Sequence, residues 1–138
     1  MKFSYKLSDA VHILAYLEIF KDGDLSSRQI AASIESNPSV VRNLMSKLRL
    51  AGLITTKQGA AKTTLAKAPE EISLYDVYRA INMERLLHVD PKTNPDCPIG
   101  RNIQSVLDET YNEIEAAAFE KMRLTSLALI IAKLKQHF

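Results

Sequence analysis

The segment 25–66 constrains the fold most, because it contains the start and stop signals of two short helices followed by a hairpin. Ser26 and Ser27 carry hydroxyls that can accept hydrogen bonds from the unpaired amides of a helix start. The apolar residues that follow recur on one side of this helix: Ile30, Ala31 and Ile34. A second helix is expected to begin at Pro38, since Asn37 can cap it and proline has no N–H group to leave unpaired there.

The helix expected from Pro38 to Leu50 has an apolar side and a polar side. Its apolar positions recur at steps of three and four residues: Val41, Leu44, Met45 and Leu48. Its polar positions fall mostly on the other side: Ser39, Arg42, Asn43, Ser46, Lys47 and Arg49. Gly52 tolerates a positive φ and ends the helix, and the β-prone residues 53–56 and 63–66 are expected to pair around a turn at 57–62. With a helix ahead of it, this pattern predicts a mainly α winged helix-turn-helix, with a three-helix head and a two-stranded β wing.

Helix signals also flank this segment. Ser8 followed by Asp9 is expected to cap a first helix that ends near Gly23. After the wing, Ser73 and Asp76 have the spacing of a capping box, which predicts the start of another short helix.

The charge distribution favours a polyanionic partner for the winged segment, although the net charge of +2 on the whole chain is too small to imply one. Between Arg28 and Lys62 there are six Lys or Arg residues and one acid, Glu35, which gives a local net charge of +5. A winged helix-turn-helix presents one exposed helix to the DNA major groove and a wing that can reach the backbone or the minor groove. We therefore expect a sequence-specific DNA-binding regulator. The alternative is a cationic helix face that is only solvated.

A long helix is expected from Ile99, after a connection at 82–98 that contains three prolines. Its apolar positions follow a seven-residue rhythm and form a seam: Ile103, Val106, Leu107, Tyr111, Ile114 and Ala118. A monomer of this size has little with which to cover such a seam, whereas a second copy of the helix would cover it, so a homodimer is expected. Packing of the helix on its own domain is the alternative. Thr125 and Ser126 can start a final short helix, which is expected to fold back on the core or across the partner.

Length and composition indicate a single compact unit, because 138 residues with 46% apolar content can bury a core without disulfides. Within this unit we expect the winged head at 1–68, a short helix and connecting loop at 69–98, and the dimerisation and C-terminal helices at 99–138. No apolar run approaches the roughly 20 residues of a membrane span, and the amino terminus lacks the order of a secretion signal. A cytoplasmic protein is expected, and the spacing of the histidines predicts no metal site.

Several segments, in order and nearly end to end, resemble the Rrf2 family of bacterial transcription regulators. They are M-K-x-S near the start, the helix NPSVVRNLMSKLRLAGLI, the wing, EISLYDVYRAI and, above all, NPDCPIGRNIQ. The resemblance implies a homodimeric repressor. In such a dimer the long C-terminal helix crosses its partner, and a recognition helix lies in each half-site of an imperfect palindrome.

The resemblance also assigns DNA contacts to positions of this chain. Base readers are expected at Ser39, Arg42, Asn43, Gln58 and Gly59, with Val40 beside them in the recognition helix. Phosphate contacts are expected at Ser27, Arg28, Lys47, Arg49 and Lys62. Arg42 can bridge guanine acceptors and Asn43 can pair with an adenine edge. The wing departs from the family's glycine-rich tip, since alanines follow Gly59 and an arginine common at the Gln58 position is absent, which argues against minor-groove insertion.

Iron-sulfur members of the family use three cysteines in the connection before the long helix, whereas only Cys97 is present here. A cluster normally needs several thiolates, so no iron-sulfur cluster and no other cofactor is expected. Cys97 lies between Asp96 and Pro98, just before a helix start whose dipole favours a thiolate. Two interpretations remain open: a redox-sensing thiol, or a small buried residue that packs the loop against the helix.

Two other functional classes are weaker hypotheses. A winged helix can serve as a protein-interaction module without DNA binding, but such a module would not need cations on its exposed helix. A thiol enzyme would need a base within hydrogen-bond reach of Cys97, and the nearest histidine in sequence, His88, is separated from it by a proline-rich stretch. No enzymatic activity is expected. The sequence specifies no effector, and both a redox signal and a metabolite stay open as hypotheses.

Overall fold

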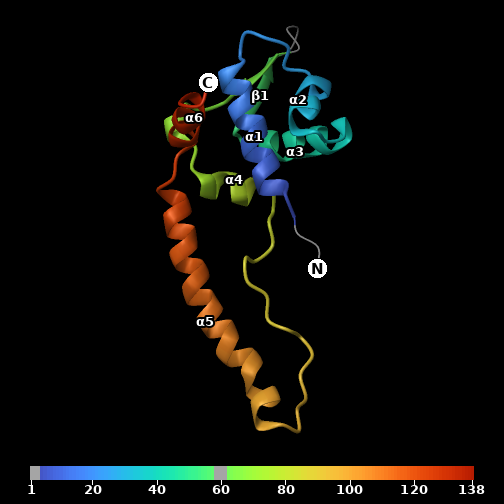
Figure 1. Cartoon of the computed structure of the whole chain (residues 1–138), viewed down its shortest axis with the longest axis vertical. Coiled ribbons are helices and arrows are strands. Elements are labelled where there is room, and N and C mark those ends of the chain that lie inside the picture. Colours follow the sequence, from blue (N-terminus) through green and yellow to red (C-terminus); the bar gives the residue numbers. More distant parts are fainter. Residues whose placement is uncertain (1–3, 58–61) are drawn as a thin grey trace. The chain divides into compact units, whose positions relative to one another are not determined.

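The computed structural model describes residues 4–57 and 62–138 (Figure 1). Internal packing divides the chain into two compact units, which we describe separately. We call Met1–Met83 together with Met122–Phe138 the head, and Glu84–Lys121 the arm. The last helix belongs to the head, although it follows the arm in the sequence.

The element order confirms a mainly α fold with a two-stranded wing. The head contains α1 (Lys6–Ile19), α2 (Ser27–Ile34), α3 (Pro38–Leu50), β1 (Ile54–Lys57), β2 (Lys62–Leu65), the 3-10 helix η1 (Pro69–Glu71), α4 (Leu74–Ala80) and α6 (Leu127–Lys135). α1 runs through the middle of the head, with α2 and α3 on one side and α6 on the other (Figure 1). α5 (Pro98–Arg123) forms most of the arm. Across residues 4–57 and 62–138, no helix combines the length and the apolar character needed to cross a membrane.

The helix-turn-helix begins and ends at the local signals expected for α2 and α3. The Ser26 hydroxyl accepts a hydrogen bond from the Gln29 amide, and Asn37 Oδ1 accepts one from the Ser39 amide at 2.8 Å. Both caps satisfy amides that a helix start leaves unpaired. Between the two helices, Glu35 closes α2 in the left-handed backbone region with φ 59°, a conformation that glycine adopts at lower cost.

The expected cap at Ser8 is wrong. α1 begins ahead of this residue, with Tyr5 at the capping position and no side-chain cap hydrogen bond. The Tyr5 carbonyl accepts from the Asp9 amide at 2.9 Å, so Ser8 lies inside the first turn. The helix also ends at Ile19, earlier than the expected end near Gly23.

Buried apolar residues from α1, α2, α3, α4 and α6 join in one core. Its largest fully buried side chains are Ile13, Leu14, Leu17, Ile30, Val41, Leu48, Ile54, Ile72, Val77, Ile81 and Leu127. The four apolar positions expected on α3 are all buried: Val41, Leu44, Met45 and Leu48. Burial of this side determines which side of α3 faces the solvent.

The wing pairs β1 and β2 in antiparallel register, with Lys57 opposite Lys62 at the end of the described ladder. Gly52 supplies the left-handed turn after α3, with φ 78°. The Leu53 carbonyl accepts from the Ala66 amide at 2.9 Å, which extends the pairing toward the core. Each strand has the four residues that the sequence predicted, but it lies one residue nearer the tip than expected.

Backbone pairing brings α6 back to the head. Ser73 and Asp76 form the expected capping box at the start of α4, with hydrogen bonds of 2.9 and 3.0 Å. The Ile72 carbonyl beside this box accepts from the Leu127 amide at 2.7 Å, and the Ser126 side chain caps α6. Of the two positions expected for the final helix, the structure shows the one folded back on the core.

In the arm, Arg85 fastens the segment 84–97, which we call the strap, to α5. Its Nε donates to Glu115 Oε1 at 2.9 Å, and its Nη1 donates to Asp108 Oδ1 at 2.7 Å. Its Nη2 donates to Asn112 Oδ1 at 2.8 Å. These acceptors are three or four residues apart and therefore share one face of α5. The Leu86 amide adds a bond of 3.0 Å to Glu115 Oε2, so a carboxylate side chain that is only 5% exposed is paired at both oxygens.

The NPDCPIG motif forms the turn that closes the strap onto the start of α5. The Asn94 carbonyl accepts from the Cys97 amide at 3.2 Å, and the Thr93 hydroxyl donates to the Gly100 carbonyl. A Cβ atom at Gly100 would overlap the Asn94 carbonyl oxygen and would lie 3.0 Å from the Asn94 nitrogen. Glycine is therefore required here for close approach of two backbone segments.

Replacing Gly100 with alanine is expected to reduce the local stability of the arm by about 1–3 kcal/mol, because the new methyl group meets backbone that cannot rotate away. Hydrogen exchange should show this as faster exchange of the Cys97 and Arg101 amides, which bond to Asn94 and Cys97 carbonyls. Gly23→Ala is the matched control, since its Cβ would lie at an ordinary contact distance of 3.4 Å from the Phe20 carbonyl oxygen. Unchanged exchange at both amides in Gly100→Ala would contradict the prediction.

Candidate nucleic-acid interface

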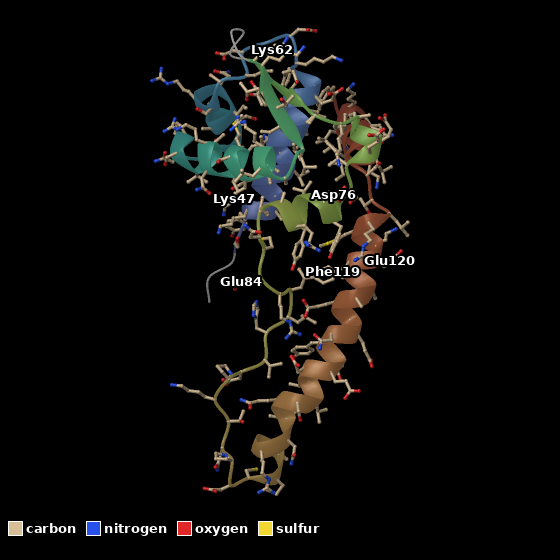
Figure 2. The ribbon with its side chains drawn as sticks, turned by 180° about the vertical axis from the view of Figure 1, so that it is seen from behind. Lys47, Lys62, Asp76, Glu84, Phe119 and Glu120 are labelled. Atoms are coloured by element: carbon tan, nitrogen blue, oxygen red, sulfur yellow. The ribbon has the colours of Figure 1, made fainter. Side chains whose placement is uncertain are left out.

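The polar side of α3 faces the solvent. The expected base readers Ser39, Arg42 and Asn43 are all exposed. Val40 is 43% exposed at the edge of this side, and Lys47 is half-buried. Figure 2 labels Lys47 on α3. We call this side of α3 the reading face.

Side-chain hydrogen bonds join the reading face to the start of the helix-turn-helix. Asn37 Oδ1 accepts from both the amide and the hydroxyl of Ser39, each at 2.8 Å. Arg42 Nη1 lies 3.5 Å from Ser27 Oγ on α2, which is long for a hydrogen bond. The Arg42 guanidinium is therefore held weakly and can move to a base edge at little cost. Arg28, the next residue on α2, is exposed.

Arg49, an expected phosphate contact, also bonds to the wing. Its Nη2 donates to Thr56 Oγ1 at 3.0 Å, and Thr56 Oγ1 lies 3.1 Å from Thr63 Oγ1 on the other strand. Thr63 is 6% exposed, so this chain of bonds reaches from the end of α3 into the buried side of the wing. The sequence analysis missed both threonines as positioning residues. Side chains alternate between the two sides of a strand, and Thr56 pairs with Thr63 across the hairpin. This alternation could have indicated from the sequence that the two threonines share one side.

We expect Arg49→Ala and Thr56→Val each to lower the free energy of unfolding by about 0.5–1.5 kcal/mol, because each removes a side-chain hydrogen bond that positions the wing. Only Arg49→Ala also removes a cation. It alone should make DNA affinity less dependent on salt, by about one unit of the log–log slope. Denaturant titration and binding at several salt concentrations measure the two effects. Unchanged stability in both variants would show that Arg49 does not anchor the wing.

The wing carries two lysines at its described end. Lys57 and Lys62 are exposed and directly opposite each other in the strand register. Like charges in such a pair weaken a hairpin, and an anion bound between them removes this cost. The other predicted wing contacts, Gln58 and Gly59, lie outside the described residues.

The predicted dimer seam lies along α5 in the arm. Val106 and Ile114 are 56% and 51% exposed. The other seam residues are half-buried: Ile103, Leu107, Tyr111 and Ala118. Helical geometry places the centre of the seam roughly a third of a turn from the face that Arg85 occupies, so the strap leaves much of it uncovered.

Cys97 is half-buried at the start of α5. The backbone N–H groups of Gly100 and Ile99 lower the pKa of its thiol, because hydrogen bonds from them favour the thiolate. This environment supports the interpretation as a reactive thiol, whereas the partial burial supports a packing role. Both roles, the redox-sensing thiol and the packing residue, therefore stay predictions for Cys97.

Comparison with known proteins agrees with this geometry. The family model Rrf2, described as an iron-dependent transcriptional regulator, matches residues 3–133. The chain belongs to the Rrf2 family. It is 39% identical over 123 residues to YwnA of Bacillus subtilis, a candidate HTH-type transcriptional regulator, and the match spans 88% of this chain and 91% of YwnA.

Solved structures show the same fold. A crystal structure of a candidate DNA-binding protein is 35% identical, with a TM-score of 0.73, and the match covers 91% of this chain and 98% of that one. A candidate transcriptional regulator from Lactobacillus plantarum is 25% identical, with a TM-score of 0.78, and the match covers 96% of this chain and 91% of that one. The Rrf2 protein described here is thus a DNA-binding transcriptional regulator by family, in agreement with the expectation that it is not an enzyme.

The iron dependence in the family's description does not fit the donor set of this Rrf2 protein. Its sequence contains one cysteine, Cys97, whereas an iron-sulfur cluster needs several thiolates. Among residues 4–57 and 62–138, no three His, Cys, Asp or Glu side chains gather as metal ligands would.

Proposed function

We propose that this Rrf2 protein is a homodimeric repressor that binds an imperfect palindrome. Each α3 enters a major-groove face with Arg42 and Asn43 toward the bases, and the wing lysines contact phosphates. Two copies related by a two-fold axis match two half-sites about one helical turn apart. Bound there, the dimer blocks transcription sterically.

The observation that carries the proposal is the exposed cationic reading face joined to the wing by Arg49. The four apolar residues of α3 are buried, so its polar side is the one available to a partner. The Arg49–Thr56–Thr63 chain holds the wing lysines in a set position relative to that side. A module that only bound protein would have no need of this concentration of positive charge.

The homodimer is supported by the seam on α5. Val106 and Ile114 each expose more than half of their surface. The polar contacts between the strap and α5 lie on a different face of the helix, so the strap does not cover these two side chains. A second copy of the helix buries these side chains and gains roughly 25 cal/mol per Å² of apolar area. The strap and the seam helix are also the proposed receivers of a redox or metabolite signal, which would change the spacing of the two reading faces.

Selection of bound sequences from a random DNA pool, at two salt concentrations, tests the proposal. We expect a two-fold symmetric motif and weaker binding at the higher salt concentration, because phosphate contacts release counterions. Recovery of no enriched motif would count against specific recognition. Binding that ignores salt would instead favour a winged-helix module whose partner is a protein.

A further inference from the structure

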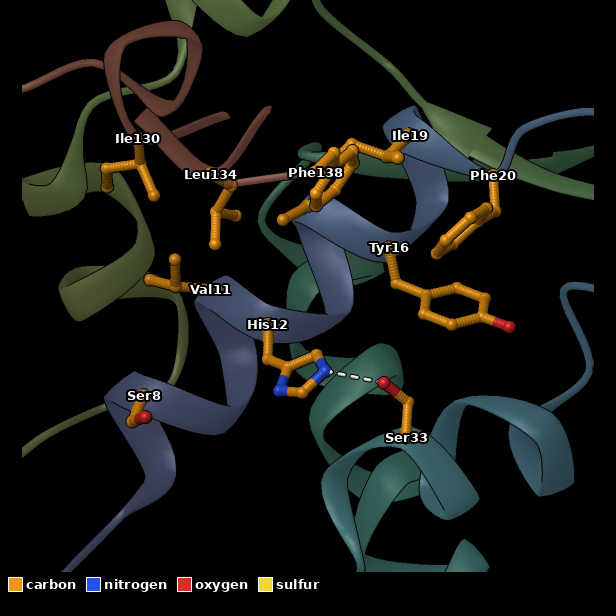
Figure 3. Close-up of a pocket in the computed structure, with 11 residues that line it drawn as sticks. Ser8, Val11, His12, Tyr16, Ile19, Phe20, Ser33, Ile130, Leu134 and Phe138 are labelled. Carbon is orange, nitrogen blue, oxygen red and sulfur yellow. Dashed lines mark hydrogen bonds between the residues drawn. The ribbon is translucent and has the colours of Figure 1, made fainter. Parts of the chain in front are cut away.

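A cavity lies in the head between α1, α2 and α6 (Figure 3). Its volume is about 320 Å³, and its walls come from α1, α2 and α6, together with the residues at the ends of α1 and α6. Small-molecule pockets begin at roughly 300 Å³, so this space accepts a compound of one or two fused rings. Among the residues that the structure describes, no proposed DNA contact and no seam residue lines it.

The walls of the cavity are apolar and partly aromatic. Tyr16 and Phe20 pack with ring centroids 4.9 Å apart and planes tilted by 57°. Ile130 and Leu134 face them from α6, beside Phe138 (Figure 3). No Asp, Glu, Lys or Arg is among the described lining residues, so a charged ligand would lose its hydration without compensation.

One polar pair lies in this apolar surface. His12 Nε2 on α1 and Ser33 Oγ on α2 are 2.8 Å apart (Figure 3). Both groups can donate or accept, depending on the histidine tautomer. A ligand oxygen that enters the cavity can therefore form a hydrogen bond with either of them.

The rim of the cavity exposes large apolar side chains. Phe20 is 51% exposed, Leu134 is 40% exposed and Phe138 is 79% exposed. A ring that covered them would remove apolar surface from water, at roughly 25 cal/mol per Å². A planar aromatic molecule matches both the shape of the walls and the rings at the rim.

We propose that this cavity binds a small uncharged aromatic compound with one hydrogen-bonding oxygen, and that occupancy changes DNA affinity. The effect on DNA affinity rests on the proposed function. A ligand oxygen competes for the His12–Ser33 bond, which links α1 to α2. α2 also carries Ser27, whose hydroxyl lies beside Arg42 on the reading face, so a shift of α2 reaches the expected base reader.

Titration of the full chain with 2-naphthol and with naphthalene tests the site. The chain contains no tryptophan, so the fluorescence of the probes can be followed with little protein background. We expect saturable binding of both probes, with 2-naphthol bound about 3- to 10-fold more tightly because of its hydrogen bond. His12→Phe combined with Ser33→Ala removes both hydrogen-bonding partners and should reduce this difference to less than about twofold, and the matched control His88→Phe, in the arm, should leave it unchanged.

A second variant keeps the test valid if the protein with both substitutions, His12→Phe and Ser33→Ala, fails to fold. Ser8 is exposed on the first turn of α1 and lines the cavity, so Ser8→Phe should fill part of the space without disturbing the core. We expect it to weaken both probes at least about fivefold. Absence of saturable binding to the unmodified protein would overturn the site, and so would binding that neither variant affects.

The effect of the ligand on DNA affinity is tested by a separate measurement. At the concentration that half-saturates the unmodified protein, 2-naphthol should change that protein's affinity for a selected operator and should change the affinity of Ser8→Phe much less. An unchanged operator affinity in the unmodified protein would overturn the coupling. Because probe binding is measured without DNA, failure to select any operator would count against the proposed function alone. If Leu134→Glu dissociated a dimer and no probe bound, the cavity would be an interface between copies, which would also overturn the ligand site.

Discussion

Replacing Ile114 with glutamate is expected to convert the protein from a dimer into a monomer. Ile114 is 51% exposed on the seam side of α5, and a two-fold partner would bury it. The new carboxylate would then lose its hydration with no cation to pair with, and symmetry brings two such charges into one interface. A monomer holds only one half-site, so operator affinity should fall by roughly 100-fold or more. Sedimentation equilibrium and gel-shift titration measure the two effects.

Ala116→Glu provides the control for this prediction. Ala116 is exposed on α5, roughly half a turn from the centre of the seam, and glutamate is as good a helix former as isoleucine or better. The same charge should therefore leave the dimer intact. A dimer that survived Ile114→Glu at micromolar concentration, or that both substitutions dissolved equally, would show that α5 does not pair along this side.

Replacing Arg42 with alanine is expected to remove most of the discrimination between the operator and random DNA. Each bidentate contact to guanine contributes about 1–3 kcal/mol, and a dimer makes it twice, so operator affinity should fall by roughly 30-fold or more. The fold should be little affected, because Arg42 is exposed and its contact with Ser27 is long at 3.5 Å. Gel-shift competition between operator and random duplexes measures the ratio of affinities.

Arg28→Ala separates the reading of bases from the general attraction to phosphate. Arg28 is exposed on α2 and is an expected phosphate contact, so its loss should weaken operator and random DNA equally and lower the salt slope by about one per subunit. Arg42→Ala should instead lower operator affinity selectively. If Arg42→Ala lowered the affinity for operator and random DNA equally, Arg42 would contact the DNA backbone rather than a base.

The sequence predicted the helix-turn-helix well because its signals are local. Asn37 followed by a proline defines the start of α3, and the Ser73–Asp76 box defines the start of α4, without help from distant residues. The alternation of buried and exposed positions then identified the reading face. At Ser8 the same logic failed, because a serine and an aspartate resemble a cap wherever they occur, and an upstream turn extended α1 past them.

The missed features depend on contacts between distant residues. Arg85 is 30 positions from Glu115, and no local pattern pairs a lone arginine with one particular carboxylate of a polar helix. Arg49 and Thr56 are closer in sequence, but their contact requires the strand to return beside α3. The cavity is a similar case, since its walls join the first and last helices of the chain.

The Arg85 cluster has a consequence for how such proteins diversify. Arg85 and all of its hydrogen-bond acceptors lie in the arm. These bonds between α5 and the strap would therefore form even if the arm were joined to a different head. Recombination that exchanges residues 84–121 as one cassette would preserve those bonds and would leave the core of the winged part untouched. Bacteria could thus combine one operator specificity with many different sensory inputs.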